Sequence, residues 1–254
     1  MKVIFLGTGT SQGVPVIGCN CKVCTSIDHR DNRLRSSIFV QYGDLNIVVD
    51  TGPDFRQQML RARINNLDAI LFTHSHKDHT AGMDDIRSYN FLQKRDMPIY
   101  ATDFTLERLK QEFSYIFAET KYPGVPQVAT NAITKNPFEI SGQKIVPIEV
   151  MHYKMPVLGF RFGDFTYITD ANHISDEEKE KIKGSKVIVL NALQKKQHIS
   201  HYSLSEAIEV LQELNPEKAY LTHIGHFMGL HSEVSNELPE NIEIAWDGLE
   251  LTFD

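Results

Sequence analysis

A histidine-rich segment directly follows an apolar run in the first third of the chain. The run is Ala69–Phe72, and after Thr73 the chain reads His-Ser-His-Lys-Asp-His. The candidate ligands in this segment are His74, His76, Asp78 and His79. The run predicts a buried strand, so these side chains lie where a strand ends in a loop. Imidazole and carboxylate suit zinc, manganese or iron, and their alternation can direct ligands to two neighbouring ions. The alternative is a surface histidine cluster without an ion.

The length, composition and charge of the chain restrict its expected domain organisation, its cellular location and its binding partners. A chain of 254 residues, 41% hydrophobic and 23% charged, is ordinary for one large domain over 1–254. No run approaches the length of a membrane span, and the six residues before Gly7 are too short for a signal peptide. We therefore expect a cytoplasmic protein without a membrane partner. A net charge of −7 makes nucleic acid an unlikely partner unless a local basic patch exists.

Three cysteines form a second candidate metal site. Cys19, Cys21 and Cys24 are the only cysteines and lie in one short segment. An odd number so closely spaced argues against a disulfide framework and favours a metal clip over three reduced thiols in a loop. Three thiolates lack one ligand for tetrahedral zinc. We expect His226, three residues after His223, to supply it and to make a closed structural site.

Runs typical of strands alternate with helical segments along the whole chain. Three further candidate ligands each follow such a run: His152, Asp170 and His223. This rhythm predicts a mixed α and β domain, with two sheets covered by helices and ligands at loop ends. The helix that begins at Ser203 has a Ser-x-x-Glu capping box.

Two segments leave alternatives open. Asp50 ends a predicted strand, where it either accepts a hydrogen bond from a metal-bound histidine or caps a helix expected over Asp54–Arg63. The residues from Lys121 to Pro137 lack periodicity and are expected to form a loop. A loop of this length often serves as a lid or a subunit contact, so a homodimer is one expected assembly.

The order His-x-His-x-Asp-His, then a single His, a single Asp and a last His, resembles the signature of the metallo-β-lactamase superfamily. The resemblance implies an α/β (α+β) fold, the four-layer αββα sandwich. It implies that His74, His76 and His152 hold one ion, zinc or manganese. Asp78, His79 and His223 would hold a second, with Asp170 bridging both. Two divalent ions about 3.5–4 Å apart can share a hydroxide at neutral pH and stabilise a leaving oxygen, so hydrolysis is the expected chemistry.

The N-terminal motif narrows the resemblance to one branch. Residues 7–15 read Gly-Thr-Gly-Thr-Ser-Gln-Gly-Val-Pro, and with the cysteine cluster and Asp170 they resemble the phosphodiesterase branch, especially PhnP-type phosphoribosyl cyclic phosphodiesterases. This implies a small cyclic phosphodiester substrate and a structural zinc on the three cysteines and His226. It also implies catalytic roles for Asp78 and His201. His201 precedes a helix N-terminus, which favours an anion, and could protonate the leaving alkoxide or hold the phosphate. His198 is the nearby alternative.

Other functions on the same fold stay open. A ribonuclease Z-like RNA endonuclease would use the same metals, but no long RNA-binding arm is visible and the acidic balance disfavours it. Thioester or lactam hydrolases form another class. A non-catalytic binding or cofactor-maturation protein is a third alternative, against which the complete set of seven ligands argues.

Overall fold

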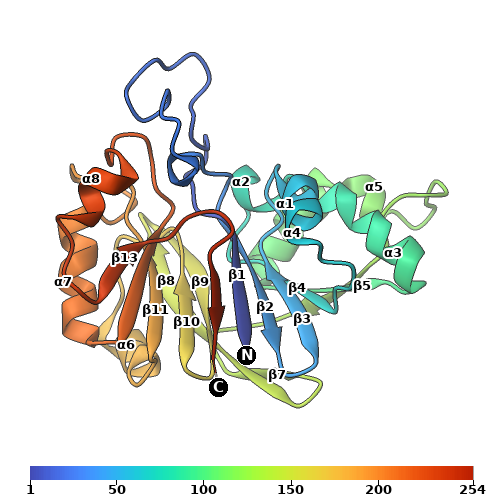
Figure 1. Ribbon diagram of the computed structural model, residues 1–254. Coiled ribbons are helices and arrows are strands. Elements are labelled where there is room, and N and C mark those ends of the chain that lie inside the picture. The colour runs from blue at the N-terminus through green and yellow to red at the C-terminus, as the bar shows by residue number, and fades with distance from the viewer. Residues whose placement is uncertain (254) are drawn as a thin grey trace. The chain divides into compact units, whose positions relative to one another are not determined.

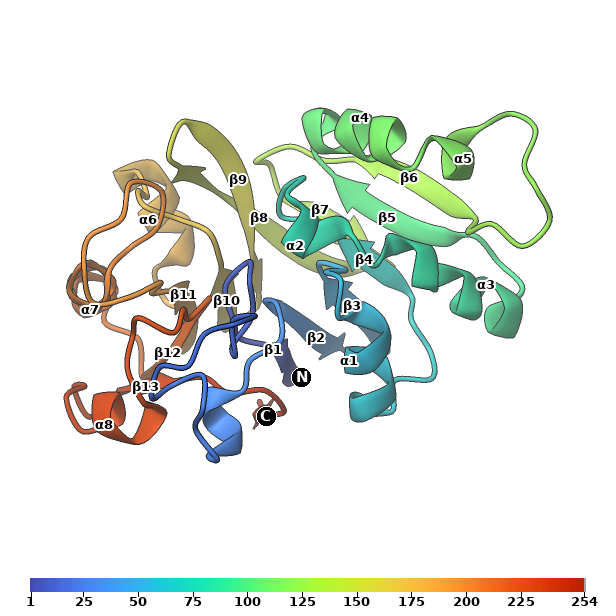
Figure 2. The ribbon, with the colours of Figure 1, turned by 90° about the horizontal axis from the view of Figure 1, so that it is seen from above.

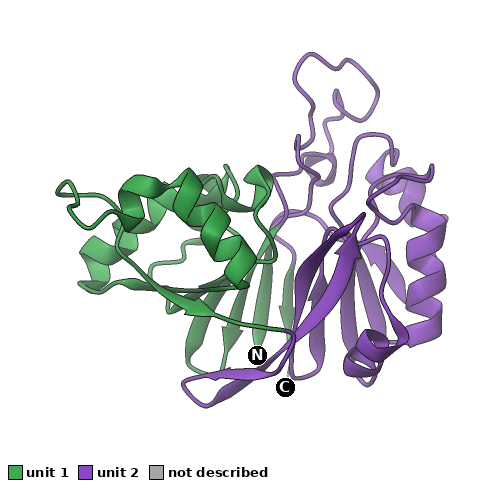
Figure 3. Cartoon of the chain, turned by 180° about the vertical axis from the view of Figure 1, so that it is seen from behind, with its two compact units in different colours: residues 1–6, 37–134, 250–254 green, residues 7–36, 135–249 purple. Residues whose placement is uncertain are grey.

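The computed structural model describes residues 1–253, and these divide into two compact units (Figure 3). Unit 1 contains residues 1–6, 37–134 and the C-terminal stretch from 250, and unit 2 contains residues 7–36 and 135–249. Within the described residues each unit has one seven-stranded sheet. Both units are thus built from stretches that are separated in the sequence.

The sheet of unit 1 has the strand order β14-β1-β2-β3-β4-β5-β6. Its strands are β1 (Lys2–Gly7), β2 (Ser37–Tyr42), β3 (Leu45–Val49), β4 (Ala69–Leu71), β5 (Met97–Ala101), β6 (Val128–Ala132) and β14 (Glu250–Thr252). Strands β2 and β3 form a hairpin, since Tyr42 pairs with Leu45 across a two-residue turn in which Gly43 has a φ of 61°. From β3 to β6 the strands are parallel, so their carboxyl ends, including the end of β4, lie at one edge.

Helices of unit 1, which are labelled in Figure 1, contribute to its core. They bury apolar side chains together with the strands. They are α1 (Phe55–Ala62), α2 (Lys77–Thr80), the 3-10 turn η2 (Met83–Ile86), α3 (Arg87–Gln93), α4 (Asp103–Glu112) and α5 (Ser114–Phe117). Phe55 of α1, Tyr89 of α3 and Leu109 of α4 share one core with strand residues. Each fully buried side chain of this size contributes about 1.5–3 kcal/mol, so this core fixes the loops that leave the strands.

The prediction of a loop over residues 121–137 is wrong for its second half. Val128–Ala132 forms β6, which pairs in parallel with β5 from Met97↔Val128 to Ala101↔Ala132. None of the residues of β6 is buried, so the strand has no alternating apolar pattern. The backbone of β5 supplies its hydrogen-bond partners instead, which side-chain periodicity cannot reveal. A role of the remaining loop as a lid or subunit contact stays a prediction.

The sheet of unit 2 has the order β13-β12-β11-β10-β9-β8-β7. Its strands are β7 (Phe138–Ile140), β8 (Gln143–His152), β9 (Met155–Phe162), β10 (Phe165–Ile168), β11 (Val187–Asn191), β12 (Lys218–Thr222) and β13 (Ile242–Ile244). Strands β10 to β13 are parallel, and β8 runs in the same direction because β9 is antiparallel to both β8 and β10. The carboxyl ends of β8, β10 and β12 therefore share one edge.

The helices of unit 2 are α6 (Asp176–Ile182), α7 (Leu204–Leu214) and α8 (His231–Ser235), with a 3-10 turn η1 at His29–Asp31. The predicted capping box is confirmed at the start of α7, where Ser203 and Glu206 bond each other's backbone amides. Leu204, Ala207 and Leu211 of this helix are buried in the core of the unit. Among residues 1–253, we find no helix with the length and apolar character that a bilayer crossing requires.

A buried polar network ties the N-terminal loop of unit 2 to its C-terminal part. Arg33 is 4% exposed, and its guanidinium donates to Thr8 Oγ1 (2.8 Å), to the carbonyl of Ala245 (2.5 Å) and to His231 Nδ1 (3.2 Å). Since guanidinium nitrogens only donate, His231 Nδ1 must accept, and the imidazole is neutral. Burial, followed by the charges of Arg33 and Arg30, lowers the pKa of His231 to about 4, against opposing effects of Asp28 and Asp31.

Protonation of His231 is therefore expected to destabilise the folded protein in acid. The pKa is about 6.5 in the unfolded chain and about 4 in the folded one, so stability is lost as the pH falls through this window. At pH 5 the expected loss is about 2 kcal/mol. Urea unfolding at pH 7 and pH 5 measures this loss of unfolding free energy. The wild type is compared with His231→Asn, which keeps an acceptor for Arg33. Equal pH slopes for the two proteins would contradict the expectation, while metal loss affects both alike.

Candidate functional site

The histidine-rich segment of unit 1 follows β4 and runs into α2, as the strand-then-loop pattern predicts. The ring of His74 lies 4.6 Å from that of His76 and 4.3 Å from that of His79, measured between centroids. His74 and His79 are buried, whereas His76 is exposed and Asp78 is half-buried. Unit 1 therefore holds all four candidate ligands between the end of β4 and the end of α2, with one imidazole open to solvent.

Asp50 orients one of these imidazoles. Its Oδ2 accepts from His79 Nδ1 (2.7 Å) and from Thr73 Oγ1 (2.8 Å), and its Oδ1 accepts from the amide of Thr73 (2.8 Å). The open alternative, a cap on α1, does not hold, because the residue before α1 is Asp54. Burial raises the pKa of Asp50, while His79 and Thr73 act in the opposite direction. A bond to Nδ1 leaves Nε2 of His79 as the nitrogen available to a metal.

Asp50→Asn is expected to weaken metal binding about 10- to 100-fold, the usual effect of removing the partner of a metal-bound histidine. Asparagine preserves the size of the side chain and tolerates the φ of 66° at this position, so the fold is expected to persist. Competition with a chromogenic chelator measures the affinity. Asp44→Asn, at an exposed turn position of the same unit, is the matched control. Equal affinities in all three proteins would restrict Asp50 to a role in folding.

Unit 2 gathers its candidate residues at the shared edge of β8, β10 and β12. His152 is the last residue of β8, Asp170 follows β10 and His223 follows β12. Asp170 Oδ1 lies 3.1 Å from His223 Nδ1, and Asp170 Oδ2 lies 3.3 Å from His201 Nε2. His152, Asp170 and His201 place one ligand atom each within 4.8 Å of one another. All four residues are at most 9% exposed.

His201 is the central imidazole of this group. Its ring stacks on that of His223 at 4.9 Å and meets that of His152 at 4.6 Å. His198, the alternative to it, lies with its Nδ1 atom 3.3 Å from Nδ1 of His201, and it is His201 whose Nε2 lies 3.3 Å from Asp170 Oδ2. His152 Nδ1 bonds to the carbonyl of Ser200 at 2.8 Å, which leaves its Nε2 as the nitrogen available to a metal.

Three residues of the candidate site have a strained backbone conformation. Asp50, Asp170 and His223 all have left-handed backbone angles, with φ of 66°, 56° and 58°. Such conformations cost about 1–3 kcal/mol in non-glycine residues and persist where the surroundings hold them, often at functional sites. His223 is held by Ser36 Oγ at 3.2 Å from Nδ1 and by Thr10 Oγ1 at 3.3 Å from Nε2. Sequence reasoning missed both hydroxyls, which lie 187 and 213 residues away in the chain.

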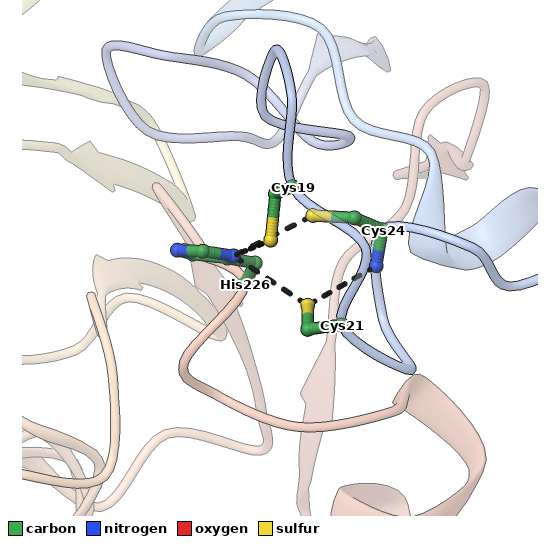
Figure 4. A group of neighbouring side chains, drawn as sticks. All are labelled: Cys19, Cys21, Cys24 and His226. Carbon is green, nitrogen blue, oxygen red and sulfur yellow. Dashed lines mark hydrogen bonds between the residues drawn. The ribbon is translucent and has the colours of Figure 1, made fainter.

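The cysteine cluster of unit 2 meets His226 (Figure 4). The sulfur atoms of Cys19, Cys21 and Cys24 lie 3.3, 3.6 and 3.5 Å from His226 Nδ1. One ring nitrogen has one lone pair or one proton, so it cannot make three hydrogen bonds. Tetrahedral zinc, with Zn–S near 2.3 Å and Zn–N near 2.05 Å, would place each sulfur about 3.5 Å from the nitrogen. The donor set and spacing therefore fit a four-coordinate zinc ion.

The thiols of this cluster differ in acidity. The backbone amide of Cys24 lowers the pKa of Cys21 to about 6, so Cys21 is largely a thiolate at neutral pH. Burial raises the pKa of Cys24 to about 11. A metal ion binds only thiolates and would have to displace the proton of Cys24. Metal affinity at this cluster is accordingly expected to fall in acid.

Comparison with known proteins places these residues in a family context. The profile of the beta-lactamase superfamily domain matches residues 45–224. The crystal structure of a diphosphatase from the PhnP family is similar to the chain at 39% identity and a TM-score of 0.93, covering 100% of this chain and 98% of that one. The zinc-bound structure of PqqB from Methylobacterium extorquens has a TM-score of 0.80 at 19% identity, which speaks only for the fold. The predicted fold class, the αββα sandwich, is confirmed.

A curated relative carries a different activity. The octanoyltransferase of Porphyromonas gingivalis (strain W83) is 36% identical to this chain over 257 residues, covering 100% of the chain. The chain, however, spans only 52% of the length of that relative.

Proposed function

The chain belongs to the PhnP family of the metallo-β-lactamase superfamily and is a metal-dependent hydrolase, and from this we propose that it is a dinuclear-metal phosphodiesterase. Its substrate is a small phosphodiester, of the kind found in a cyclic phosphoribosyl 1,2-phosphate. The observation that carries this proposal is the convergence of Asp170 with His201, His152 and His223 at one sheet edge. A bridging carboxylate with histidines around it suits a pair of divalent ions.

The proposal assigns seven ligands to the two ions. In the assignment that the family pattern implies, His74, His76 and His152 hold one ion. Asp78, His79 and His223 hold the other, and Asp170 bridges them. Within unit 1 the close imidazoles support this assignment, and within unit 2 the contacts of Asp170 support it. Zinc and manganese both suit these ligands.

Each group has a separate task in this chemistry. When bound, the ions supply an activated water and neutralise charge on the phosphoryl oxygens. Asp50 holds His79 in one tautomer, and the carbonyl of Ser200 does the same for His152. His201, buried beside Asp170, is proposed to protonate the leaving alkoxide or to hold the phosphate. Asp78 is the other proposed catalytic residue.

A structural zinc ion on Cys19, Cys21, Cys24 and His226 is a second part of the proposal. The sulfur–nitrogen distances of 3.3–3.6 Å support it. A closed site of this kind would hold the loop around residue 20 against the segment that follows His223. Its role is to stabilise the fold, because all four coordination positions are taken by protein side chains.

Cleavage of a diphosphate is the second candidate function. The relative with 39% identity is a diphosphatase, and the same constellation could attack a phosphoric anhydride as readily as an ester. Phosphate or a phosphate monoester would then leave in place of an alkoxide. Ribonuclease Z-like cleavage, thioester or lactam hydrolysis, and a non-catalytic binding role are less well supported. Octanoyl transfer enters only through a relative twice as long.

A substrate panel tests the proposal. Purified protein reconstituted with zinc or manganese is given bis(p-nitrophenyl) phosphate, a ribosyl 1,2-cyclic phosphate, a nucleoside diphosphate, a precursor transfer RNA and an octanoyl thioester. Products are identified by ³¹P NMR, gel electrophoresis and thiol release. We expect turnover of the small diester, lost on chelation and restored by metal.

Each other outcome selects a different function. Cleavage of the nucleoside diphosphate alone would replace the proposal with the diphosphatase. Cleavage of the RNA or the thioester alone would select one of the remaining hydrolases. Metal-loaded protein that turns over none of the substrates would contradict an enzymatic role in phosphoryl transfer. Cytoplasmic location, a homodimer and a single domain stay predictions.

A further inference from the structure

A cleft on unit 1 is lined by residues of α1, η2 and α3 and by none of the candidate metal ligands. Figures 1 and 2 label the two helices, α1 and α3, that contribute most of the lining. The volume of the cleft is about 490 Å³, within the range of about 300–1,000 Å³ that is usual for small-molecule sites. The lining comes from α1, from the turn after it, from η2 and from α3. No part of the proposed phosphodiesterase chemistry uses these side chains.

The body of the cleft is apolar. Phe55, Met59 and Tyr89 form its buried part, and the hydroxyl of Tyr89 is already bonded to the carbonyl of Ile64 at 2.8 Å. Leu60 of α1 and Leu92 of α3 also line the cleft and are 62% and 71% exposed. These two exposed leucines, together with the buried apolar side chains, are suited to contact an apolar ligand in the cleft.

The rim of the cleft carries an excess of positive charge. Arg56 and Arg63 line it and are exposed, and within residues 1–253 the structure gives neither guanidinium an acidic partner. Asp85 is the single acidic side chain of the lining, so its net charge is +1. Guanidinium groups recognise carboxylate, sulfonate and phosphate through paired hydrogen bonds. An anionic head and an apolar body on one small molecule would satisfy both parts of the cleft.

We propose that the α1–α3 cleft binds a small amphipathic anion, with its apolar body on Phe55, Met59 and the two leucines and its anionic head on Arg56 and Arg63. The cleft also adjoins the candidate metal loop. Gly82, three residues after His79, packs against Phe55 so closely that a Cβ there would lie 2.7 Å from Phe55 Cβ. The amide of Gly82 donates to Thr51, whose own amide donates to the carbonyl of His79. The occupied cleft is therefore a direct neighbour of that loop.

Isothermal titration calorimetry with octanesulfonate tests the proposal on the full-length protein. Sulfonate is a poor metal ligand, and titration of chelator-treated protein in parallel removes any contribution of the metal centre. The wild type is expected to bind one molecule, whereas ethanesulfonate, which has the same head without the apolar body, should not bind measurably. Arg56→Gln with Arg63→Gln is expected to weaken binding about two- to thirtyfold, the range for two exposed ion pairs.

Matched variants separate the cleft from the rest of the surface. Lys110→Gln removes one exposed positive charge on α4 and should leave binding unchanged. Leu92→Ser should weaken binding without loss of the fold, because Leu92 is mostly exposed. Equal affinity of the arginine double variant and the wild type would overturn the proposal. A second copy of the chain in the cleft would also overturn it. Light scattering would then show a wild-type dimer that does not bind octanesulfonate and that dissociates when Leu92 is replaced by Ser.

Discussion

His76→Ala is expected to lose bound metal and to reduce hydrolytic turnover at least about 100-fold, while the fold persists. His76 is exposed, so its removal costs little packing, whereas His74 and His79 beside it are buried. Removing only the hydrogen-bond partner of a metal ligand already costs about 10- to 100-fold, and removing the ligand itself costs more. Metal content by plasma mass spectrometry, turnover of bis(p-nitrophenyl) phosphate and thermal melting measure the three effects.

His29→Ala is the control for this experiment. The side chain of His29 is 79% exposed and belongs to none of the proposed metal sites. It should keep both metal content and turnover. Unchanged turnover in His76→Ala would remove the metal mechanism, and a collapsed fold would show that His76 acts in stability instead.

Cys21→Ala is expected to release about one zinc ion per chain and to destabilise the protein while residual hydrolysis persists. Metal bound only by the folded state contributes its binding energy to folding. A loss of about 3 kcal/mol would lower Tm by roughly 6–12 °C in a chain of this size. The cluster of Cys21, Cys24, Cys19 and His226 shares no residue with the proposed catalytic set, so chemistry should survive below the lowered Tm.

Lys22→Ala provides the matched control next to the same cysteine. Lys22 forms a surface ion pair with Glu233 at 2.6 Å, and both side chains are more than half exposed, so its removal should change stability by at most about 1 kcal/mol. Zinc content equal to that of the wild type in Cys21→Ala would exclude the structural zinc. Calorimetry under reducing conditions keeps oxidation of the remaining thiols out of the comparison.

Residues that follow apolar runs were predictable from the sequence. His152, Asp170 and His223 each follow a strand, and parallel strands bring their carboxyl ends to one edge. The pattern therefore predicted which side chains would converge within unit 2. The position of His226, three residues after His223 in the turn that follows β12, likewise led us to predict it as the fourth ligand of the cysteine cluster. These predictions depend on local periodicity and on a general property of sheets.

Contacts between distant segments were not predictable in the same way. Ser36 and Thr10 hold His223, and Arg33 bonds His231, yet no local pattern in the sequence marks these pairs. The left-handed backbone conformation of Asp170 could not be predicted from the sequence either, because aspartate adopts many backbone conformations. Strand β6 was missed because its side chains are largely exposed and only its backbone is paired. Such features arise from tertiary packing and need coordinates.

The pairing of β1 with β14 has a consequence for biosynthesis. Lys2 pairs with Thr252 and Ile4 with Glu250. Strand β1 therefore cannot pair with its outer neighbour β14 until residues 250–252 have been translated. Until then, one edge of β1 offers unpaired amides and carbonyls to any other nascent chain. Ribosome-bound intermediates stalled before residue 250 are thus the species in which chaperone protection of this edge would matter most.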